Sequence, residues 1–207
     1  WTLQSTLTVS AGRTITLTNG HLDTNSQIVS NTDFQSSNAN VRELTLGNSS
    51  WTAPSGNNAT WNITDSTNMT LNAGTSDIRF NTTTGISVFN GGGLTYADMT
   101  VNATLTTGTV TFTGVNTFGN LTLSGGAGTT GAFIFGANQN VTGTLTGLGN
   151  SVINRIYYRS SVKGTPRTLT AATFTFTNID MQDMVGVDSG GADSRDLSAI
   201  TGGSGDC

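Results

Sequence analysis

The sequence predicts an all-β protein, and composition is the first of two observations that indicate it. Thr, Asn and Gly fill 88 of the 207 positions, with 40, 21 and 27 residues, whereas Glu43 and Lys163 are the only residues of their types. Thr is β-branched and favours strands, while the straight-chain residues that favour helices are scarce. The net charge of −4 is small and the apolar runs are regular, which is not typical of a disordered chain.

Alternation of apolar and polar residues is the second observation. A period of two places one set of side chains on each face of a strand, so the apolar residues point inward and Thr points outward. Between these runs lie Asn and Gly clusters, which tolerate positive φ and therefore mark corners. Clear alternating runs, in chain order, are Leu7-Thr8-Val9, Ile15-Thr16-Leu17, Leu44-Thr45-Leu46, Met69-Thr70-Leu71, Val110-Thr111-Phe112, Leu121-Thr122-Leu123 and Phe174-Thr175-Phe176.

These strands repeat along the chain. The pattern apolar-x-x-apolar, then Thr or Asp, then apolar begins at Val41, Tyr96, Phe118 and Phe176, and Met69 begins a weaker copy. We take Leu44, Met69, Met99 and Leu121 as equivalent positions of successive copies. Their spacing of roughly 20–30 residues is the length of one turn of a β-solenoid. Stacked turns bury apolar faces that a single turn cannot.

We therefore expect a right-handed parallel β-helix of eight or nine turns. The alternative is a β-sandwich or jelly roll made of hairpins. Hairpins would favour two-residue Asn-Gly turns, and such turns occur only at Asn19-Gly20 and Asn90-Gly91.

The expected solenoid covers residues 1–184. Residues 185–207 are rich in Gly, Asp and Ser and are predicted to form a terminal loop or a linker to a missing segment. Residues 51–60 contain Pro54 and are predicted to form a loop outside the coil. The start at Trp1, without Met or a signal pattern, indicates either a removed leader or a piece of a longer protein. The last residues, 202–207, resemble a loop cut short and favour the piece. No membrane span is expected, because no run approaches 18 apolar residues.

Charge and cysteine content exclude further classes. The sequence pI of about 4.6 argues against a nucleic-acid surface. Four of the eight basic residues fall within positions 155–167, which we interpret as solvated charge beside a turn. The single cysteine, Cys207, cannot form an internal disulfide.

Several phrases resemble repeats in known β-solenoid proteins of bacteriophages and in secreted bacterial adhesin-like proteins. They are residues 71–76 (Leu-Asn-Ala-Gly-Thr-Ser), 91–96 (Gly-Gly-Gly-Leu-Thr-Tyr), 116–122 (Asn-Thr-Phe-Gly-Asn-Leu-Thr), 159–165 (Arg-Ser-Ser-Val-Lys-Gly-Thr) and 168–172 (Thr-Leu-Thr-Ala-Ala). The resemblance covers roughly residues 60–207. It implies a virion structural protein, such as a fibre, tail or capsid-decorating rod, or else a cell-surface adhesin or autotransporter-like passenger. It brings no catalytic residues.

A third, disfavoured function is a polysaccharide-degrading tailspike, which would need paired carboxylates. The closest pair in an expected strand, Asp180 and Asp183, is spaced by three residues and would point to opposite faces. His21 follows a turn and has no second histidine to join it. We therefore expect no enzyme activity.

Aromatic and amide side chains supply the candidate sugar contacts. Trp51 lies at the mouth of the expected loop, with Asn57 and Asn58 nearby, and would stack on a sugar if its ring reached solvent. Tyr157 and Tyr158 place one ring on each face of a strand, so one of them is expected to point outward. The outward ring would suit a subunit contact as well as a ligand.

Asp188, Asp193 and Asp196 are the candidate metal ligands, because carboxylates in a Gly-rich segment can bind a structural Ca²⁺. No other cofactor is expected. The expected partners are other virion or surface proteins, further copies of the chain in a homotrimer, and a host-surface glycan. The expected location is a virion surface, or an extracellular or bacterial cell surface.

Overall fold

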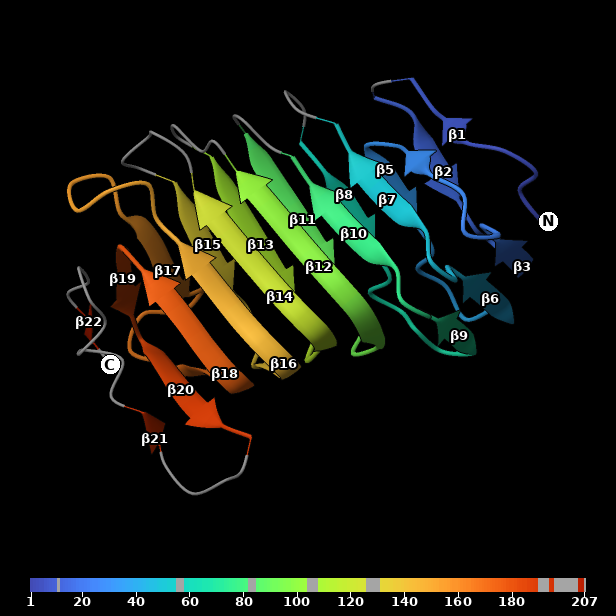
Figure 1. The fold of residues 1–207 in the computed structure, drawn as a ribbon. Helices are drawn as coiled ribbons and strands as arrows, with labels where there is room; N and C mark the ends of the chain where they lie inside the picture. The colour runs from blue at the N-terminus through green and yellow to red at the C-terminus, as the bar shows by residue number, and fades with distance from the viewer. Residues whose placement is uncertain are drawn as a thin grey trace.

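The structure is a computed structural model of the chain. It describes residues 1–10, 12–54, 58–81, 85–103, 108–125 and 131–189, and the backbone of 194–195 and 205–206. The regular structure in these ranges is all β-strand (Figure 1). The strands stack in about seven turns of a β-solenoid, which confirms the expected fold class, although eight or nine turns were expected. No helix in the described ranges is long and apolar enough to cross a membrane.

The front sheet, nearest the viewer in Figure 1, has ten strands in the order β1-β4-β7-β10-β12-β14-β16-β18-β20-β21. All of its described ladders are parallel except β20–β21. Its strands are Leu7–Thr8 (β1), Val29–Ser30 (β4), Ser50–Ala53 (β7), Asp77–Phe80 (β10), Thr95–Ala103 (β12), Thr117–Gly125 (β14), Gln139–Leu148 (β16), Arg167–Thr177 (β18), Met184–Asp188 (β20) and Ser194–Arg195 (β21).

The back sheet has nine parallel strands and the side sheet has three. The back strands are Thr14–Thr16 (β2), Asp33–Gln35 (β5), Thr60–Asn62 (β8), Ile86–Asn90 (β11), Thr109–Thr113 (β13), Ala132–Phe135 (β15), Ile156–Ser160 (β17), Ile179–Gln182 (β19) and Gly205–Asp206 (β22). The side strands are Gly20–Asp23 (β3), Arg42–Thr45 (β6) and Met69–Asn72 (β9). From β12 to β18 the front strands lengthen to 9–11 residues, and the side sheet ends at β9.

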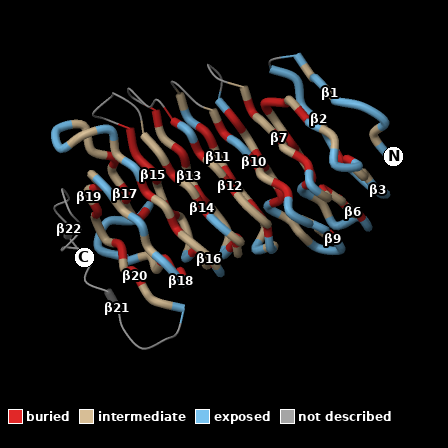
Figure 2. The backbone as a smooth tube through the Cα atoms, in the orientation of Figure 1, coloured by how far each residue is buried: buried red, intermediate tan, exposed pale blue. Residues whose placement is uncertain are grey.

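One core runs between the sheets through the whole stack. Along most strands buried residues alternate with partly exposed ones, as the period-two pattern predicted (Figure 2). The back sheet contributes a column of five rings from successive turns, the aromatic column: Phe34, Trp61, Phe89, Phe112 and Phe135. Successive ring centroids in it lie 4.4, 6.2, 6.0 and 5.4 Å apart. Such ring pairs add to the stabilisation that burial provides.

A buried arginine joins two turns at a corner of the side sheet. Arg42 is 1% exposed. Its guanidinium donates to the carbonyl of Ser36, to that of Asn40 at 3.1 Å, and, one turn on, to those of Asp65 at 3.1 Å and Thr67 at 2.8 Å. Hydrogen bonds from the Thr67 side chain and backbone lower the pKa of Asp65, and the charge of Arg42 lowers it further. The buried cation is thus held by carbonyl oxygens.

Buried amides join the turns at another corner. Asn116 Nδ2 donates to Gln139 Oε1 at 3.0 Å, and Asn116 Oδ1 accepts the Gly93 N–H at 3.1 Å. Gln139 Nε2 donates to the Gly114 carbonyl at 2.8 Å. One side chain therefore links three successive turns, and its polar atoms are hydrogen-bonded, as buried polar groups must be.

The register differs in part from the repeat expected from the sequence. The copies that begin at Tyr96 and Phe118 do stack opposite one another. Leu44, however, lies opposite Leu71, so its assignment to Met69 was wrong by two residues. Both registers keep apolar residues on the inner face, because a shift of two preserves the side-chain period.

Two further copies of the pattern are not equivalent to the others. Val41 precedes β6 and is 76% exposed, so it is no core position. Phe176 and Ile179 belong to different sheets, because Asn178 turns the chain between them with a φ of 56°. Left-handed backbone of this kind is tolerated best by Gly and Asn.

Two expected boundaries also shift. The segment 51–60 was expected to be a loop, but Trp51 to Ala53 belong to β7 and Thr60 begins β8; residues 55–57 lie outside the described residues. Parallel stacking continues beyond residue 184, because β20 pairs with β18 as far as Asp188. Most of the expected terminal loop or linker lies outside the described residues.

Candidate functional site

The outer face of the front sheet carries one polar residue, in register, from each of the eight strands from β1 to β18. We call this row the threonine column. Its members are Thr8, Ser30, Thr52, Arg79, Thr100, Thr122, Thr146 and Thr175. Neighbouring parallel strands lie about 4.8 Å apart, so the hydroxyl groups form a regular polar ladder.

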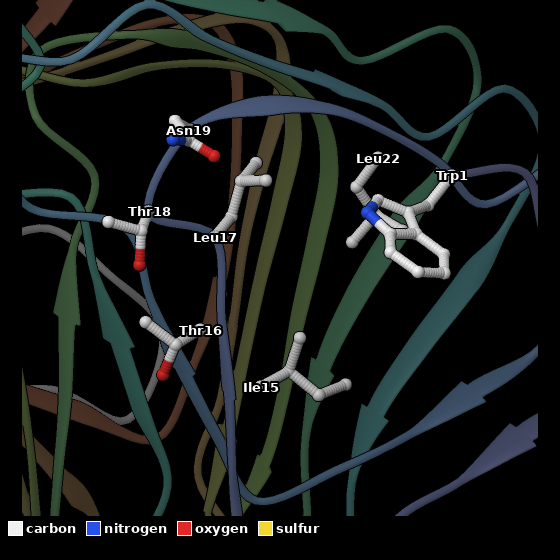
Figure 3. A pocket seen from close by; sticks show the side chains of 7 residues that line it. All are labelled: Trp1, Ile15, Thr16, Leu17, Thr18, Asn19 and Leu22. Atoms are coloured by element: carbon white, nitrogen blue, oxygen red, sulfur yellow. The ribbon is translucent and has the colours of Figure 1, made fainter.

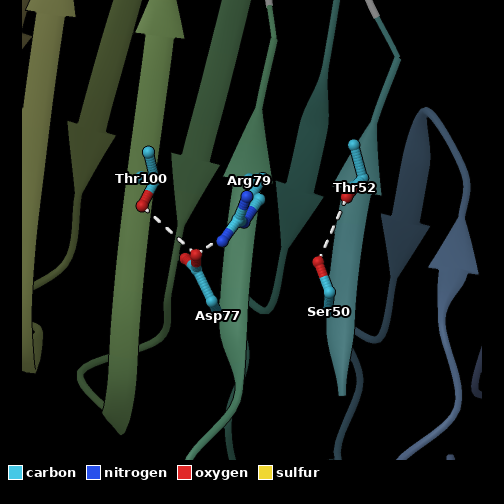
Figure 4. Close-up of polar contacts among 5 residues, drawn as sticks. All are labelled: Ser50, Thr52, Asp77, Arg79 and Thr100. Carbon is cyan, nitrogen blue, oxygen red and sulfur yellow. Dashed lines mark hydrogen bonds and ion pairs between the residues drawn. The ribbon is translucent and has the colours of Figure 1, made fainter.

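Arg79 interrupts the threonine column and organises the charges beside it (Figure 4). The Arg79 Nε donates to Asp77 Oδ2 at 2.6 Å, and the Thr100 hydroxyl donates to the same oxygen at 3.3 Å. Ser50 and Thr52 lie 3.4 Å apart, oxygen to oxygen, on the next strand. The arrangement is a surface ion pair supported by hydroxyl groups.

Asp77 also lies directly opposite Asp98 on the adjacent strand, which sequence reasoning missed. Asp98 Oδ1 accepts hydrogen bonds from the backbone N–H of Asn120 at 3.0 Å and from its Nδ2 at 2.9 Å. Each carboxylate thus has its own donor: Arg79 for Asp77 and Asn120 for Asp98. Asp77 and Asp98 lie on different strands, so only the strand register shows that they are neighbours.

Trp51 does not meet the condition for a sugar platform, because its ring is 3% exposed. The ring packs in the core against Phe34 at 5.1 Å and Trp61 at 5.2 Å between centroids. Of the two amides, Asn58 is exposed and its Oδ1 accepts the backbone N–H of Ile86 at 3.0 Å. Asn57 lies outside the described residues.

The two neighbouring tyrosines point to opposite faces of β17, as expected. Tyr158 is fully buried, its hydroxyl donates to the Leu123 carbonyl at 3.1 Å, and burial raises the pKa of its phenol. Tyr157 faces outward, is half-buried, and donates to the Gln182 side-chain carbonyl. Only Tyr157 of this pair is placed for contact with another molecule.

The structure brings no metal-binding cluster together among the described residues. Asp188 ends β20 opposite Ala171. Asp193 and Asp196 lie outside the part of the chain whose side chains are described, so the expected calcium site stays a prediction.

The remaining polar candidates are held in separate contacts. Arg155 Nη1 lies 3.0 Å from Asp180 Oδ1 in an ion pair. Asp183 lies beyond the end of β19, with a φ of 54°, and its Oδ2 accepts the Gly164 N–H at 3.0 Å. His21 Nε2 lies 3.0 Å from the hydroxyl of Thr45, on the next turn.

A hollow of about 340 Å³ lies beside the first turn (Figure 3). Leu22 and the 92% exposed ring of Trp1 stand on one side of it, and Leu17 stands opposite. Its lining is Trp1, Ile15, Thr16, Leu17, Thr18, Asn19 and Leu22. Its lining mixes apolar side chains with hydroxyl and amide groups and includes no charged side chain.

Fold and surface together define a β-solenoid whose outer polar residues stand in register. No family model matches the sequence, and neither a curated protein nor a solved structure gives a significant match.

Proposed function

We propose that this protein is a structural rod of a bacteriophage particle, a fibre, tail or capsid-decorating component that works by rigid shape and repeated surface contact. The observation that carries the proposal is the continuity of the stack: one aromatic column, from Phe34 to Phe135, passes through five successive turns.

Continuity of this kind favours rigidity. Each interior strand of the front and back sheets is hydrogen-bonded to the strands before and after it in the sheet, so no interior turn can move without breaking ladders on both sides. Corner side chains such as Arg42 and Asn116 bind across turns as well. A stack of this type keeps one direction along its whole length, so the same surface contact can recur at many turns.

The outer surface supports a contact role rather than a single deep site. The threonine column offers a hydroxyl group on seven of its eight strands, and each contact it makes is weak. Several weak contacts on a rigid support give avidity without a pocket. A closed trimer would multiply these contacts further, and light scattering of the purified chain at micromolar concentration tests that assembly.

Immunogold electron microscopy tests the proposal. Antibody raised against this chain is applied to purified particles and to cells of the same culture, with antibody pre-absorbed on the chain as the control. We expect label on particles, at one position on the head or tail. Label confined to the cell surface would overturn the proposal in favour of an adhesin or autotransporter-like passenger. Release of sugar from host polysaccharide by the purified chain would favour a tailspike enzyme.

A further inference from the structure

Four of the eight basic residues fall within positions 155–167, and the structure divides them into two groups. Arg155 is neutralised by Asp180 at 3.0 Å, and its Nε donates to the Val152 carbonyl at 3.0 Å. Arg159, Lys163 and Arg167 have no ion pair among the described residues. We call these three residues and the loop between them, 159–167, the basic corner.

The basic corner joins the two large sheets. Arg159 lies on the outer face of the back sheet in β17, and Arg167 begins β18 in the front sheet. Between them, residues 161–166 are all exposed and include Lys163. The Arg167 Nε is buried without an acceptor in the described structure, and Arg159 Nη1 has only a long contact, 3.4 Å, with the Ser160 carbonyl. Arg159, which is partly exposed, and Lys163, which is exposed, are therefore the cations placed to meet an external anion.

Asp183 is an acidic residue that contacts the basic corner, and both contacts are made with backbone groups of the corner. Its Oδ2 accepts the Gly164 N–H at 3.0 Å, and its carbonyl accepts the Arg167 N–H at 2.9 Å. Counting the Arg155–Asp180 pair, four basic residues face two carboxylates here. The rest of the chain then carries four basic and ten acidic residues. The corner is thus a positive region on an acidic protein.

Hydrogen bonds fix the loop in its conformation. Ser161 N–H donates to the Phe135 carbonyl at 2.9 Å, and Thr165 N–H donates to the Val162 carbonyl at 3.1 Å. A loop ordered in advance loses little entropy on binding, which favours affinity.

We propose that the basic corner binds an acidic polysaccharide, a polymer whose sugars carry carboxylate, sulfate or phosphate groups at intervals. The positive charge of the corner favours an anionic ligand. Because the cations follow the corner from the back sheet to the front sheet, they suit a polymer that lies across it. Duplex DNA carries one negative charge per about 1.7 Å. Three cations cannot neutralise such a density, and the acidic remainder of the protein would be repelled. This inference depends on the proposed function in one respect: a bacterial envelope is where the protein would meet such a polymer.

Binding of the full chain to dextran sulfate tests the proposal, with uncharged dextran and single-stranded DNA of similar length as comparisons. The variant Arg159→Gln/Lys163→Gln removes two cations of the basic corner. The control Gln4→Glu/Arg13→Gln changes net charge by the same amount at two exposed residues at the opposite end of the stack. Far-ultraviolet circular dichroism and thermal melting confirm that both variants fold.

We expect the corner variant to lose about 25-fold in affinity for dextran sulfate, since each basic residue near an anionic surface contributes roughly fivefold. The control variant should lose less than threefold. The salt dependence of binding should also flatten in the corner variant, because fewer counterions are released.

Absence of binding to dextran sulfate at low salt would overturn the proposal, as would equal losses in the two variants or tighter binding to single-stranded DNA. None of these results depends on where immunogold label is found, so a failure here is distinguishable from a failure of the proposed function.

Discussion

Replacing Phe112 by alanine should leave a cavity in the core at the middle of the stack. Phe112 is fully buried and is the fourth ring of the aromatic column, with Phe135 at 5.4 Å and Phe89 at 6.0 Å between centroids. Phe118 and Phe133 each lie 6.5 Å away. A buried Phe→Ala change usually costs about 3–5 kcal/mol in the free energy of unfolding. Four neighbouring rings leave little room for collapse, so we expect the upper part of that range.

Urea unfolding followed by tryptophan fluorescence and by circular dichroism measures the effect. Trp51 and Trp61 report on the earlier turns, whereas circular dichroism reports on all strands. Coincident transitions for the two probes would show that the stack unfolds as one unit. The matched control is Thr111→Ala, an outward neighbour on the same strand, which should change stability by about 0.5 kcal/mol or less.

The reasoning would be refuted by a loss of less than about 1 kcal/mol in Phe112→Ala, since that is a typical cost of an average mutation and not of a core cavity. Equal effects of Phe112→Ala and Thr111→Ala would contradict the assignment of inner and outer faces.

Three further outcomes are expected. Burial raises the pKa of Tyr96 and of Tyr158. The contribution of their neutral forms to stability is therefore complete below pH 10 and falls as the pH rises further. Ultraviolet titration should show two of the three tyrosines ionising only as the chain unfolds. Simple titration of all three in the folded protein would contradict this. Arg42→Lys keeps the charge but loses the planar donors, so urea unfolding should show a loss of about 2 kcal/mol or more; an unchanged midpoint would count against the role of the guanidinium. Gly147→Val should cost about 1–3 kcal/mol, because a Cβ there would lie 2.3 Å from Ile179 Cδ1; a neutral result by the same assay would refute the close packing.

Inner and outer faces could be predicted from the sequence because they depend on local alternation. In Leu121-Thr122-Leu123 the two leucines are fully buried and the threonine faces outward. Tyr157 and Tyr158 follow the same rule. A period of two needs no knowledge of the partner strand.

The strand register could not be predicted in the same way, because it depends on the number of residues in each corner. The turn that carries Leu44 to its partner Leu71 is longer than the turn that carries Tyr96 to its partner Phe118. Since a shift by two residues keeps every apolar side chain inward, the pattern alone cannot choose between Met69 and Leu71.

The same dependence explains the errors at the candidate site. Trp51 lies close to Pro54 and was taken for a loop residue, although Ser50 to Ala53 already alternate as a strand does. Asp77 and Asp98 belong to successive turns and become neighbours only through the register of their strands. Arg42 gave no local signal, because its carbonyl partners come from two turns.

Disulfide trapping tests the stacking of successive turns most directly, and both the single core and the proposed rod depend on that stacking. In a Cys207→Ser background, Glu43→Cys/Thr70→Cys places cysteines opposite one another on adjacent strands. Their Cα atoms would lie about 4.8 Å apart, within the range of a disulfide. Thr45→Cys/Thr70→Cys instead follows the register expected from the sequence, and its Cα atoms would lie about 8 Å apart, beyond that range.

Mass spectrometry of non-reduced peptides after mild oxidation reads out both pairs. The described register predicts a rapid intramolecular disulfide in the Glu43/Thr70 pair and free thiols in the Thr45/Thr70 pair. The reverse result would contradict the described register, and free thiols in both pairs would contradict the stacking of these turns and, with it, the continuous core.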